Sequence, residues 1–381
     1  MIVPSRATNL PFLPYGRQSL DESDVEAVAQ VLRGDFLTTG PVVKAFENEV
    51  AKVSGAKFAA ACSSGTAALH LATLALGLGP GDVGIVPSIT FLATANALRY
   101  VGADVVFADV DPHNGLMDAG HLQEALQRVP APKKARVVLP VHLSGQGADL
   151  SVLSELARAK DLLIVEDACH AFGGACRHTD IAIFSFHPVK TIAAGEGGAV
   201  VTNDSVLSER IHRLLNHGMS HDPSTWRNRD MAFDALGEAL PWYYEMIEPG
   251  FNYRLSDIHS ALALSQLAKL GLAVERRRHL VALYDQALAD LAPAVRPVAR
   301  SAGWNPAWHL YVALIDFQAV GIARADVMRR LRAAGIGTQV HYIPVHKQPY
   351  YRSLNQSLTL PGAEAYYSRC LSLPLFPAME D

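Results

Sequence analysis

One lysine lies in a setting that could make it a nucleophile. Lys190 follows an apolar run at 183–186 and precedes a glycine-rich segment at 194–199. Removing water from a lysine lowers its pKa and frees the amine to attack a carbonyl carbon. Glycines let the backbone pass close to a bound ligand. Lysines are mostly surface residues, but this apolar setting favours a nucleophilic role.

Two carboxylates end a second apolar run, at 162–165. An acid at the carboxyl end of a central strand points toward the ligand crevice of an open α/β sheet. There it could hold a protonated ring nitrogen or a metal ion. For Glu166 we favour a solvated strand end, whereas for Asp167, which is followed by His170, we favour a functional role.

Two further segments could bind phosphate. Small and hydroxyl residues at 62–66 precede an apolar helical pattern, whose first N–H groups would attract an anion. An ordinary helix cap is an equally good interpretation. The sequence Gly-Phe-Asn-Tyr-Arg at 250–254 offers an amide and a guanidinium that could bind phosphate, or that could simply face solvent.

Apolar runs at even intervals predict the strands that would position these residues. Most are continuous, as expected for strands buried on both faces, and helical patterns separate several of them. The sequence therefore predicts an α/β fold with a mostly parallel central sheet between helices. The predicted strands are 84–88, 105–110, 137–143, 162–168, 181–186 and 199–202, and the predicted helices are 67–76, 93–100, 121–128 and 150–159.

The pattern changes after about residue 220. Residues 221–248 are polar and weakly patterned, which indicates a long loop or lid with short helical pieces. Residues 256–278 predict one long helix, for which Ser256 is a suitable N-cap.

A smaller C-terminal α/β domain is predicted after this helix. Strands at 307–316 and 337–342 flank a helix at 324–334. We therefore divide the chain into a large domain at 1–250, with an N-terminal arm, and a small domain at 251–381.

Composition excludes several classes of protein. The chain has 381 residues, of which 50% are hydrophobic, and it carries 33 basic against 37 acidic side chains. A net charge of −4 argues against a protein that coats nucleic acid or an anionic membrane. No apolar run reaches the roughly 18–20 residues of a membrane span, and the first residues lack the apolar core of a secretory signal. We expect a cytoplasmic protein.

No metal centre is predicted. His341 and His346 are not spaced as a helical pair, and a proline lies between them. The four cysteines form no Cys-x-x-Cys pair. They are Cys62, Cys169, Cys176 and Cys370.

Taken together, these motifs resemble those of the nucleotide-sugar aminotransferases of the DegT/DnrJ/EryC/StrS type. The resemblance covers nearly the whole chain, from about Tyr15 to Pro377. It implies a pyridoxal-phosphate enzyme of fold type I, the aspartate-aminotransferase fold, and a homodimer with active sites at the interface. The motifs lie at 64–66, 166–168, 185–190, 195–198 and 250–254.

Further strings are similar to one subgroup, the transaminases that make UDP-4-amino-4,6-dideoxy-N-acetyl-β-L-altrosamine. They lie at 14–18, 186–190, 242–245, 308–312 and 341–351. This likeness implies amination of C4 of a UDP-4-keto-6-deoxy-N-acetylhexosamine, on the route to pseudaminic acid for surface polysaccharide.

The resemblance assigns roles to several residues. Lys190 forms a Schiff base with pyridoxal 5′-phosphate and then moves a proton, as a general base. Asp167 pairs with the pyridinium nitrogen, which lets the ring act as an electron sink. His170 lies near the phenolic oxygen of the ring, and Phe91 stacks on the ring face.

The remaining assignments concern the phosphate and the substrate. Gly65, Thr66 and Ser185 hold the cofactor phosphate, and Asn252 or Arg254 completes that site from the neighbouring subunit. The candidates for lining the sugar-nucleotide pocket are His187, Tyr342 and His346. In the implied reaction, L-glutamate gives its amino group to the cofactor and leaves as 2-oxoglutarate, and the cofactor then aminates the keto-sugar.

Two segments depart from the family pattern. Residues 173–180 are short where relatives carry a longer hairpin, which puts the sugar preference in question. The chain stops at Asp381, where relatives continue into a closing helix, so we expect a less stable small domain.

Several alternatives compete with this interpretation. A sugar dehydratase of the same family carries histidine in place of the lysine, so Lys190 favours transamination. A non-catalytic sugar-sensing regulator would not need Lys190 and Asp167 together. A nicotinamide-dependent dehydrogenase would need a dinucleotide fingerprint, which is absent. An aminotransferase for another nucleotide-linked keto-sugar, at C3 or C4, stays open.

Overall fold

A computed structural model describes residues 11–147, 150–174 and 179–381. Residues 175–178, including Cys176, lie outside this description, so the expectation for the 173–180 segment is not tested. Among the described residues, no helix has the length and apolar character needed to cross a membrane.

Within the described residues, seven strands form the central sheet in the order β1-β7-β6-β5-β4-β2-β3. Neighbours from β3 to β6 are parallel, and β7 runs antiparallel to both β6 and β1. The predicted mostly parallel sheet is therefore confirmed. The strands are β1 Phe58–Cys62, β2 Asp82–Pro87, β3 Asp104–Ala108, β4 Lys134–Val138, β5 Leu163–Asp167, β6 Ile181–Ser185 and β7 Gly198–Thr202.

One strand of this sheet has no counterpart among the sequence predictions. β1 reads Phe-Ala-Ala-Ala-Cys, and alanine has little tendency to form strands. Its small side chains are buried because α2 packs over it and β7 pairs along its whole length. Tertiary packing, not local preference, makes this segment a strand.

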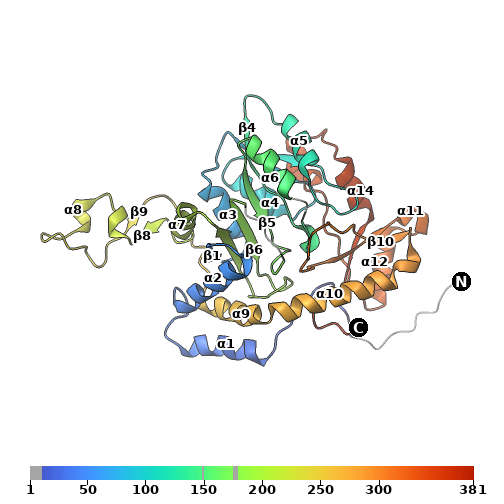
Figure 1. The fold of residues 1–381 in the computed structure, drawn as a ribbon, viewed down its shortest axis with the longest axis horizontal. Coiled ribbons are helices and arrows are strands. Elements are labelled where there is room, and N and C mark those ends of the chain that lie inside the picture. The colour runs from blue at the N-terminus through green and yellow to red at the C-terminus, as the bar shows by residue number, and fades with distance from the viewer. Residues whose placement is uncertain (1–10, 148–149, 175–178) are drawn as a thin grey trace.

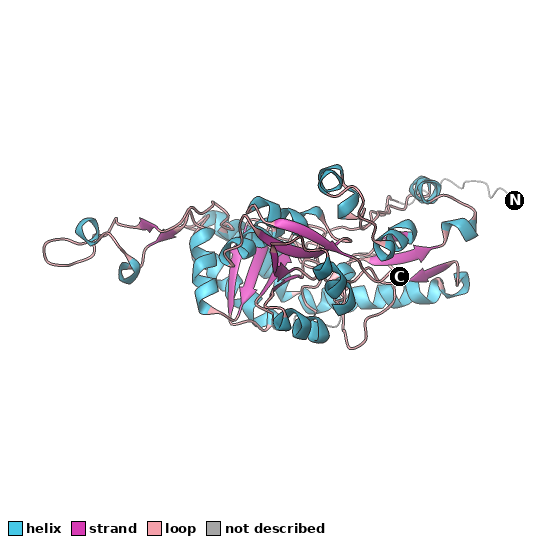
Figure 2. Cartoon of the chain, turned by 90° about the horizontal axis from the view of Figure 1, so that it is seen from above, coloured by secondary structure: helices cyan, strands magenta, loops and turns pink. Residues whose placement is uncertain are grey.

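Helices cover both faces of the sheet (Figure 1, Figure 2). The two faces have separate cores: along β6, Ile181 and Ile183 belong to one cluster, and Ala182 and Phe184 belong to the other. α3 is buried on nearly all sides, as its apolar sequence predicts. The helices that follow the strands are α3 Gly65–Ala75, α4 Leu92–Tyr100, α5 Ala119–Gln127, α6 Leu150–Ala159 and α7 Ser205–Leu214.

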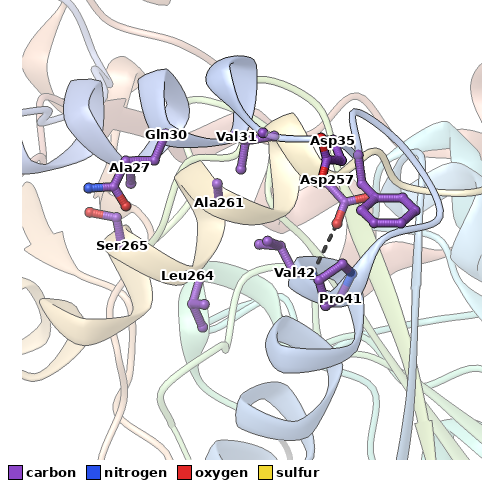
Figure 3. Close-up of a pocket in the computed structure, with 12 residues that line it drawn as sticks. Ala27, Gln30, Val31, Asp35, Pro41, Val42, Asp257, Ala261, Leu264 and Ser265 are labelled. Atoms are coloured by element: carbon purple, nitrogen blue, oxygen red, sulfur yellow. Dashed lines mark hydrogen bonds between the residues drawn. The ribbon is translucent and has the colours of Figure 1, made fainter.

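The first two helices pack against a helix from the second half of the chain. α1 (Glu22–Arg33) and α2 (Pro41–Ser54) both contact α9 (Asp257–Ala268). The buried carboxylate of Asp257 accepts hydrogen bonds from the N–H groups of Gly40 at 2.7 Å and Val42 at 3.0 Å. These contacts border a cavity of about 510 Å³, lined mainly by apolar side chains of the three helices (Figure 3).

The predicted long helix is in fact two helices. Ser256 is the N-cap of α9, as predicted, with its hydroxyl accepting from the His259 N–H. α9 ends at Ala268, and α10 continues from Leu270 to Ala287. The polar Lys269 between them binds Asp21 and Asp24 of the α1 region, which anchors the break.

The C-terminal part contains a second, three-stranded antiparallel sheet. The predicted strand at 307–316 and helix at 324–334 are confirmed as β11 and α12. The predicted strand at 337–342 is wrong: this segment makes only a single bridge, between Gln339 and Ser372, and instead lines a cavity. β12 pairs with β11 in its place. The elements are β10 Val295–Pro297, β11 Tyr311–Ile315, α11 Phe317–Val320, α12 Arg324–Ala333, α13 Pro349–Leu354, α14 Pro361–Arg369 and β12 Cys370–Leu373.

Residues 219–246 form an arm that projects from the body (yellow, at the left of Figure 1). It contains the short pieces β8 (Met219–Ser220), α8 (Arg229–Ala232) and β9 (Glu245–Met246). The predicted short helical pieces are therefore confirmed. Large apolar side chains on the arm are exposed, including Leu236 and Trp242. The division of the chain into a domain at 1–250 and a domain at 251–381 stays a prediction.

Candidate active site

A cavity of about 630 Å³ opens at the carboxyl ends of the central strands. It is lined by the end of β5, the end of β6, the start of α3 and the 339–343 segment. Its volume is that of a small-molecule site. The cavity brings together most of the predicted residues: Gly65, Thr66, Phe91, Asp167, His170, Ser185, His187, Lys190 and Tyr342.

Asp167 is the last residue of β5, and its carboxylate is buried and held on both oxygens. Thr94 Oγ1 donates to Oδ2 at 2.7 Å, and the backbone N–H of Cys169 donates to Oδ1 at 3.2 Å. These two contacts hold the carboxylate in one orientation at the cavity.

Lys190 lies in the turn that follows β6, where its N–H donates to the His187 carbonyl at 2.8 Å. Burial lowers the pKa of the Lys190 amine, and the nearby charge of Asp167 acts in the opposite direction without outweighing burial. A lowered pKa leaves more of the lysine in the neutral, nucleophilic form. The nucleophile predicted from the sequence thus has the environment that such a role requires.

The start of α3 provides a place for a phosphate. Ser64 caps the helix through its hydroxyl, which accepts from the Ala67 N–H at 3.1 Å. A Cβ on Gly65 would lie 2.8 Å from the Ser185 Cβ, so no larger residue fits there. The start of the helix, Thr66 and Ser185 all line the cavity, so helix N–H groups and two hydroxyl-bearing residues lie together there.

Two aromatic side chains, Phe91 and Tyr342, also line the cavity. Phe91, the N-cap residue of α4, is 55% exposed, and its ring centroid lies 6.1 Å from that of Tyr342. Tyr342 Oη lies 3.2 Å from His170 Nε2. Burial raises the pKa of the Tyr342 phenol, so it stays protonated. An exposed ring inside a cavity is available to stack on a flat ligand.

His346 does not line the cavity. Its Nδ1 lies 2.6 Å from the Ser88 hydroxyl, and its Nε2 lies 3.8 Å from a carboxylate oxygen of Glu364. The side chain is buried between these partners. The structure therefore places His346 in the packing behind the site, in contrast with the substrate contact predicted for it.

Asn252 and Arg254 lie outside the cavity of their own chain. The Tyr253 carbonyl between them accepts a hydrogen bond from the Ser63 N–H at 2.8 Å, and Arg254 Nη1 donates to Asn216 Oδ1 at 2.5 Å. Asn252 is exposed. The role predicted for them in a neighbouring subunit stays a prediction.

The expectation of a solvated Glu166 is wrong. The side chain is fully buried on the sheet face opposite to Asp167. His142 Nε2 lies 2.6 Å from Oε2, and the Thr179 hydroxyl donates to Oε1 at 2.6 Å. Alternation along the strand sends the two acids to opposite faces, and the partners of Glu166 come from distant loops that sequence reasoning did not connect.

Two histidines of the cavity were not predicted as site residues. His309 is 4% exposed, and its ring centroid lies 4.4 Å from that of His170. Burial lowers the pKa of His309 well below its usual value and that of His341 to about 3. The strings at 308–312 and 341–351 were the available signal, because both combine histidine with aromatic residues.

Comparison with known proteins identifies the family. The profile of the DegT/DnrJ/EryC1/StrS aminotransferase family matches residues 18–381. The chain belongs to this family. It is therefore an aminotransferase that depends on pyridoxal phosphate, and its fold is the fold type I predicted from the sequence.

Three solved structures illustrate the relationship. Helicobacter pylori PseC, an aminotransferase of pseudaminic acid biosynthesis, is 28% identical, with coverage of 97% of this chain and 95% of that chain and a TM-score of 0.85. DesI, solved in the presence of its TDP-sugar product, is 31% identical, with coverage of 98% and 90% and a TM-score of 0.83. Streptococcus pneumoniae Spr1654 in its PLP form is 26% identical, with coverage of 97% and 95% and a TM-score of 0.84.

The cavity fits the family's cofactor. Gly65, Thr66 and Ser185 offer donors to a phosphate, Phe91 offers a ring face, and Asp167 offers a carboxylate for a ring nitrogen. Among residues 11–147, 150–174 and 179–381, no group of three or more histidine, cysteine, aspartate or glutamate side chains could hold a metal ion.

Proposed function

We propose that this aminotransferase moves an amino group from L-glutamate to the C4 keto group of a UDP-4-keto-6-deoxy-N-acetylhexosamine. The reaction would serve pseudaminic-acid-type sugar biosynthesis in the cytoplasm. The proposal depends on one observation above all: Lys190, with its lowered pKa, shares a cavity with the hydrogen-bonded carboxylate of Asp167 and the start of α3. The likeness to Helicobacter pylori PseC supports the choice of acceptor.

Each group of the cavity has a distinct task in this proposal. Bound pyridoxal phosphate supplies an electron sink. The Asp167 carboxylate, kept in place by Thr94, would hold the protonated ring nitrogen. The Lys190 amine accepts and returns the proton that leaves the amino donor. Phe91 and Tyr342 exclude water from one wall of the cavity.

His187 and Tyr342 are the proposed contacts for the sugar nucleotide. Both line the cavity, and His187 is exposed at its rim. A polar group at the rim and a phenol inside suit a ligand with a charged end and a sugar end. His346 is not part of this proposal.

The proposed enzyme is a homodimer. Asn252 and Arg254 lie outside their own cavity, and a guanidinium there could reach the phosphate of another subunit. The projecting arm carries exposed Met231, Leu236 and Trp242, which are costly to leave in water. A second copy of the chain would cover them.

The first test is the visible absorbance of the purified protein with pyridoxal phosphate. L-Glutamate should bleach the band of the lysine-bound cofactor, and the keto-sugar should restore it. Lys190→Ala should show neither change, whereas Lys52→Ala, at an exposed surface lysine, should behave as wild type. Full turnover by Lys190→Ala would overturn the proposal.

The second test identifies the acceptor. UDP-4-keto-6-deoxy-N-acetylhexosamine should be aminated at C4, with the product established by mass spectrometry and NMR. A TDP-linked keto-sugar is the competing acceptor, favoured by the likeness to DesI. A preference for the TDP-linked compound, or amination at C3, would overturn the acceptor and leave the amino-transfer chemistry intact.

A further inference from the structure

A tight turn holds the wall of the cavity behind His170. Residues Leu143–Gly145 form a short 3-10 turn in which Ser144 has φ of 62° and Gly145 has φ of 101°. Residues other than glycine are rarely found in this left-handed region. A Cβ on Gly145 would lie 2.9 Å from the His170 carbonyl oxygen and 3.0 Å from the Trp308 nitrogen. The turn is therefore fixed between two segments of the site.

The peptide groups of Ser144 join two cavity histidines. The Ser144 N–H donates to His170 Nδ1 at 3.3 Å, and the Ser144 carbonyl accepts from the His309 N–H at 2.9 Å. The left-handed conformation aims these groups at both segments. No part of the Ser144 side chain is needed for either contact.

The hydrogen bond to His170 determines where its proton lies. A backbone N–H can only donate, so Nδ1 must accept and a neutral imidazole must carry its proton on Nε2. Flipping the His170 imidazole about its Cβ–Cγ bond would place ring carbon atoms against both the Ser144 N–H and the Tyr342 hydroxyl. The observed orientation satisfies both polar partners.

The surroundings of His170 exclude the doubly protonated ring. Burial lowers the pKa of His170 well below its usual value, and the positive charge of Lys190 adds to this effect. His309 and His341 also face this region and are themselves neutral near pH 7, because burial lowers both pKa values. Tyr342 is protonated, and the carboxylate of Asp167 is held by Thr94 and the Cys169 N–H. Glu196 also lines the cavity.

We propose that the backbone N–H of Ser144 fixes His170 in the tautomer with its proton on Nε2, which makes His170 a hydrogen-bond donor toward the cavity. Ser144 is then a positioning residue that acts through His170. The purpose of this donor depends on the proposed function and its cofactor. A donor at Nε2 suits the negatively charged phenolic oxygen that the family resemblance places beside His170. The opposite tautomer would present a lone pair to that oxygen and repel it.

The direct test is nitrogen NMR of the protein labelled with ¹⁵N-histidine, recorded with and without cofactor. The His170 signals are assigned by their loss in His170→Gln. We expect the pattern of a neutral ring protonated on Nε2, unchanged from about pH 6 to 8, the range in which an ordinary histidine titrates. A ring protonated on Nδ1, or one that titrates in this range, would overturn the proposal. Because the cofactor-free protein gives the same readout, failure here is distinct from failure of the proposed function.

Variants of the turn provide the second test. Ser144→Gly keeps the N–H and should keep the Nε2–H pattern. Gly145→Ala should displace the turn, give a mixture of tautomers and shift the pH midpoint of the bound cofactor's absorbance. Gly321→Ala is the matched control, because Gly321 has φ of 72° and open space around its Cβ position. An unchanged tautomer and midpoint in folded Gly145→Ala would contradict the proposal. If that variant does not fold, the wild-type spectrum decides alone.

Discussion

The Thr94 hydroxyl donates a 2.7 Å hydrogen bond to Asp167 Oδ2, and it joins residues 73 positions apart in the sequence. Thr94 lies in the first turn of α4, which begins after Phe91, and its hydroxyl lies 2.7 Å from the Thr90 hydroxyl. The helix that follows Phe91, the ring predicted to stack on the cofactor, is thus tied to the carboxylate expected to hold the ring nitrogen. The contact with the cofactor's ring face, expected from Phe91, and the contact with its ring nitrogen, expected from Asp167, would therefore be positioned together.

Thr94→Val removes this hydrogen bond and keeps the shape of the side chain. A bond to a charged group contributes about 1.5–3 kcal/mol, so cofactor affinity should fall roughly ten- to hundredfold. Titration of the cofactor-free protein with pyridoxal phosphate, followed by absorbance, measures this. Thr94→Ser keeps the hydroxyl and should bind nearly as well as wild type. Equal affinities for Thr94→Val and wild type would remove Thr94 from this role.

Asp167→Asn replaces the charge with an amide of the same size. Loss of an opposite charge moves the pKa of a partner by about 1–3 units, so the ring nitrogen should lose its proton and turnover should fall about ten- to thousandfold. Steady-state kinetics give the rate, and circular dichroism gives the fold, which should be unchanged. A rate equal to that of wild type would exclude Asp167 as the ring-nitrogen partner.

Glu166→Ala should destabilise the protein strongly, because it leaves buried His142 and Thr179 without their shared acceptor. Removing one partner of a buried pair costs about 3–5 kcal/mol. Urea unfolding measures the change. The control is Glu26→Ala, whose ion pair with Arg33 is exposed and worth little. Similar losses in the two variants would mean that Glu166 behaves as a surface acid.

His212 gives a pH dependence of stability. Burial alone would lower its pKa, but the hydrogen bond to Glu47, the charge of Glu47 and the hydrogen bond to the Ser208 carbonyl together outweigh burial and raise it. A raised pKa in the folded state stabilises the protein below the ordinary histidine pKa of about 6.5, and this stability is lost as the pH rises through the raised value. The melting temperature of His212→Gln should therefore lie below that of wild type at acidic pH. The gap should close as the pH increases, and a gap that widened would contradict this assignment.

Much of the site could be predicted because its signals are local. Asp167 and Ser185 end their strands, Gly65 begins α3, and Lys190 lies in the turn that follows β6. In a parallel sheet these ends meet at one edge. The order of motifs along the chain then indicated the family. Local sequence is sufficient to predict a site residue where the position of that residue in its strand or helix already places it at the cavity.

Other features depend on contacts between distant segments. The burial of Glu166 follows from His142 and Thr179, and the placement of His346 follows from Ser88. The sequence at 337–342 predicts a strand, yet the segment makes a single bridge and its residues 339–342 line the cavity. A one-dimensional pattern does not distinguish a side chain that faces a core from one that faces a ligand site.

The carboxylate of Asp257, which caps the start of α2, also constrains the order in which the chain can fold during synthesis. Residues 40–43 leave the ribosome long before residue 257 is added, yet their N–H groups find this partner only then. Leu13 likewise pairs with Gly335 and Gly337. The N-terminal segments are therefore among the last to complete their native contacts during synthesis. Nascent chains that stop short of α9 should leave α1 and α2 open to proteases and chaperones.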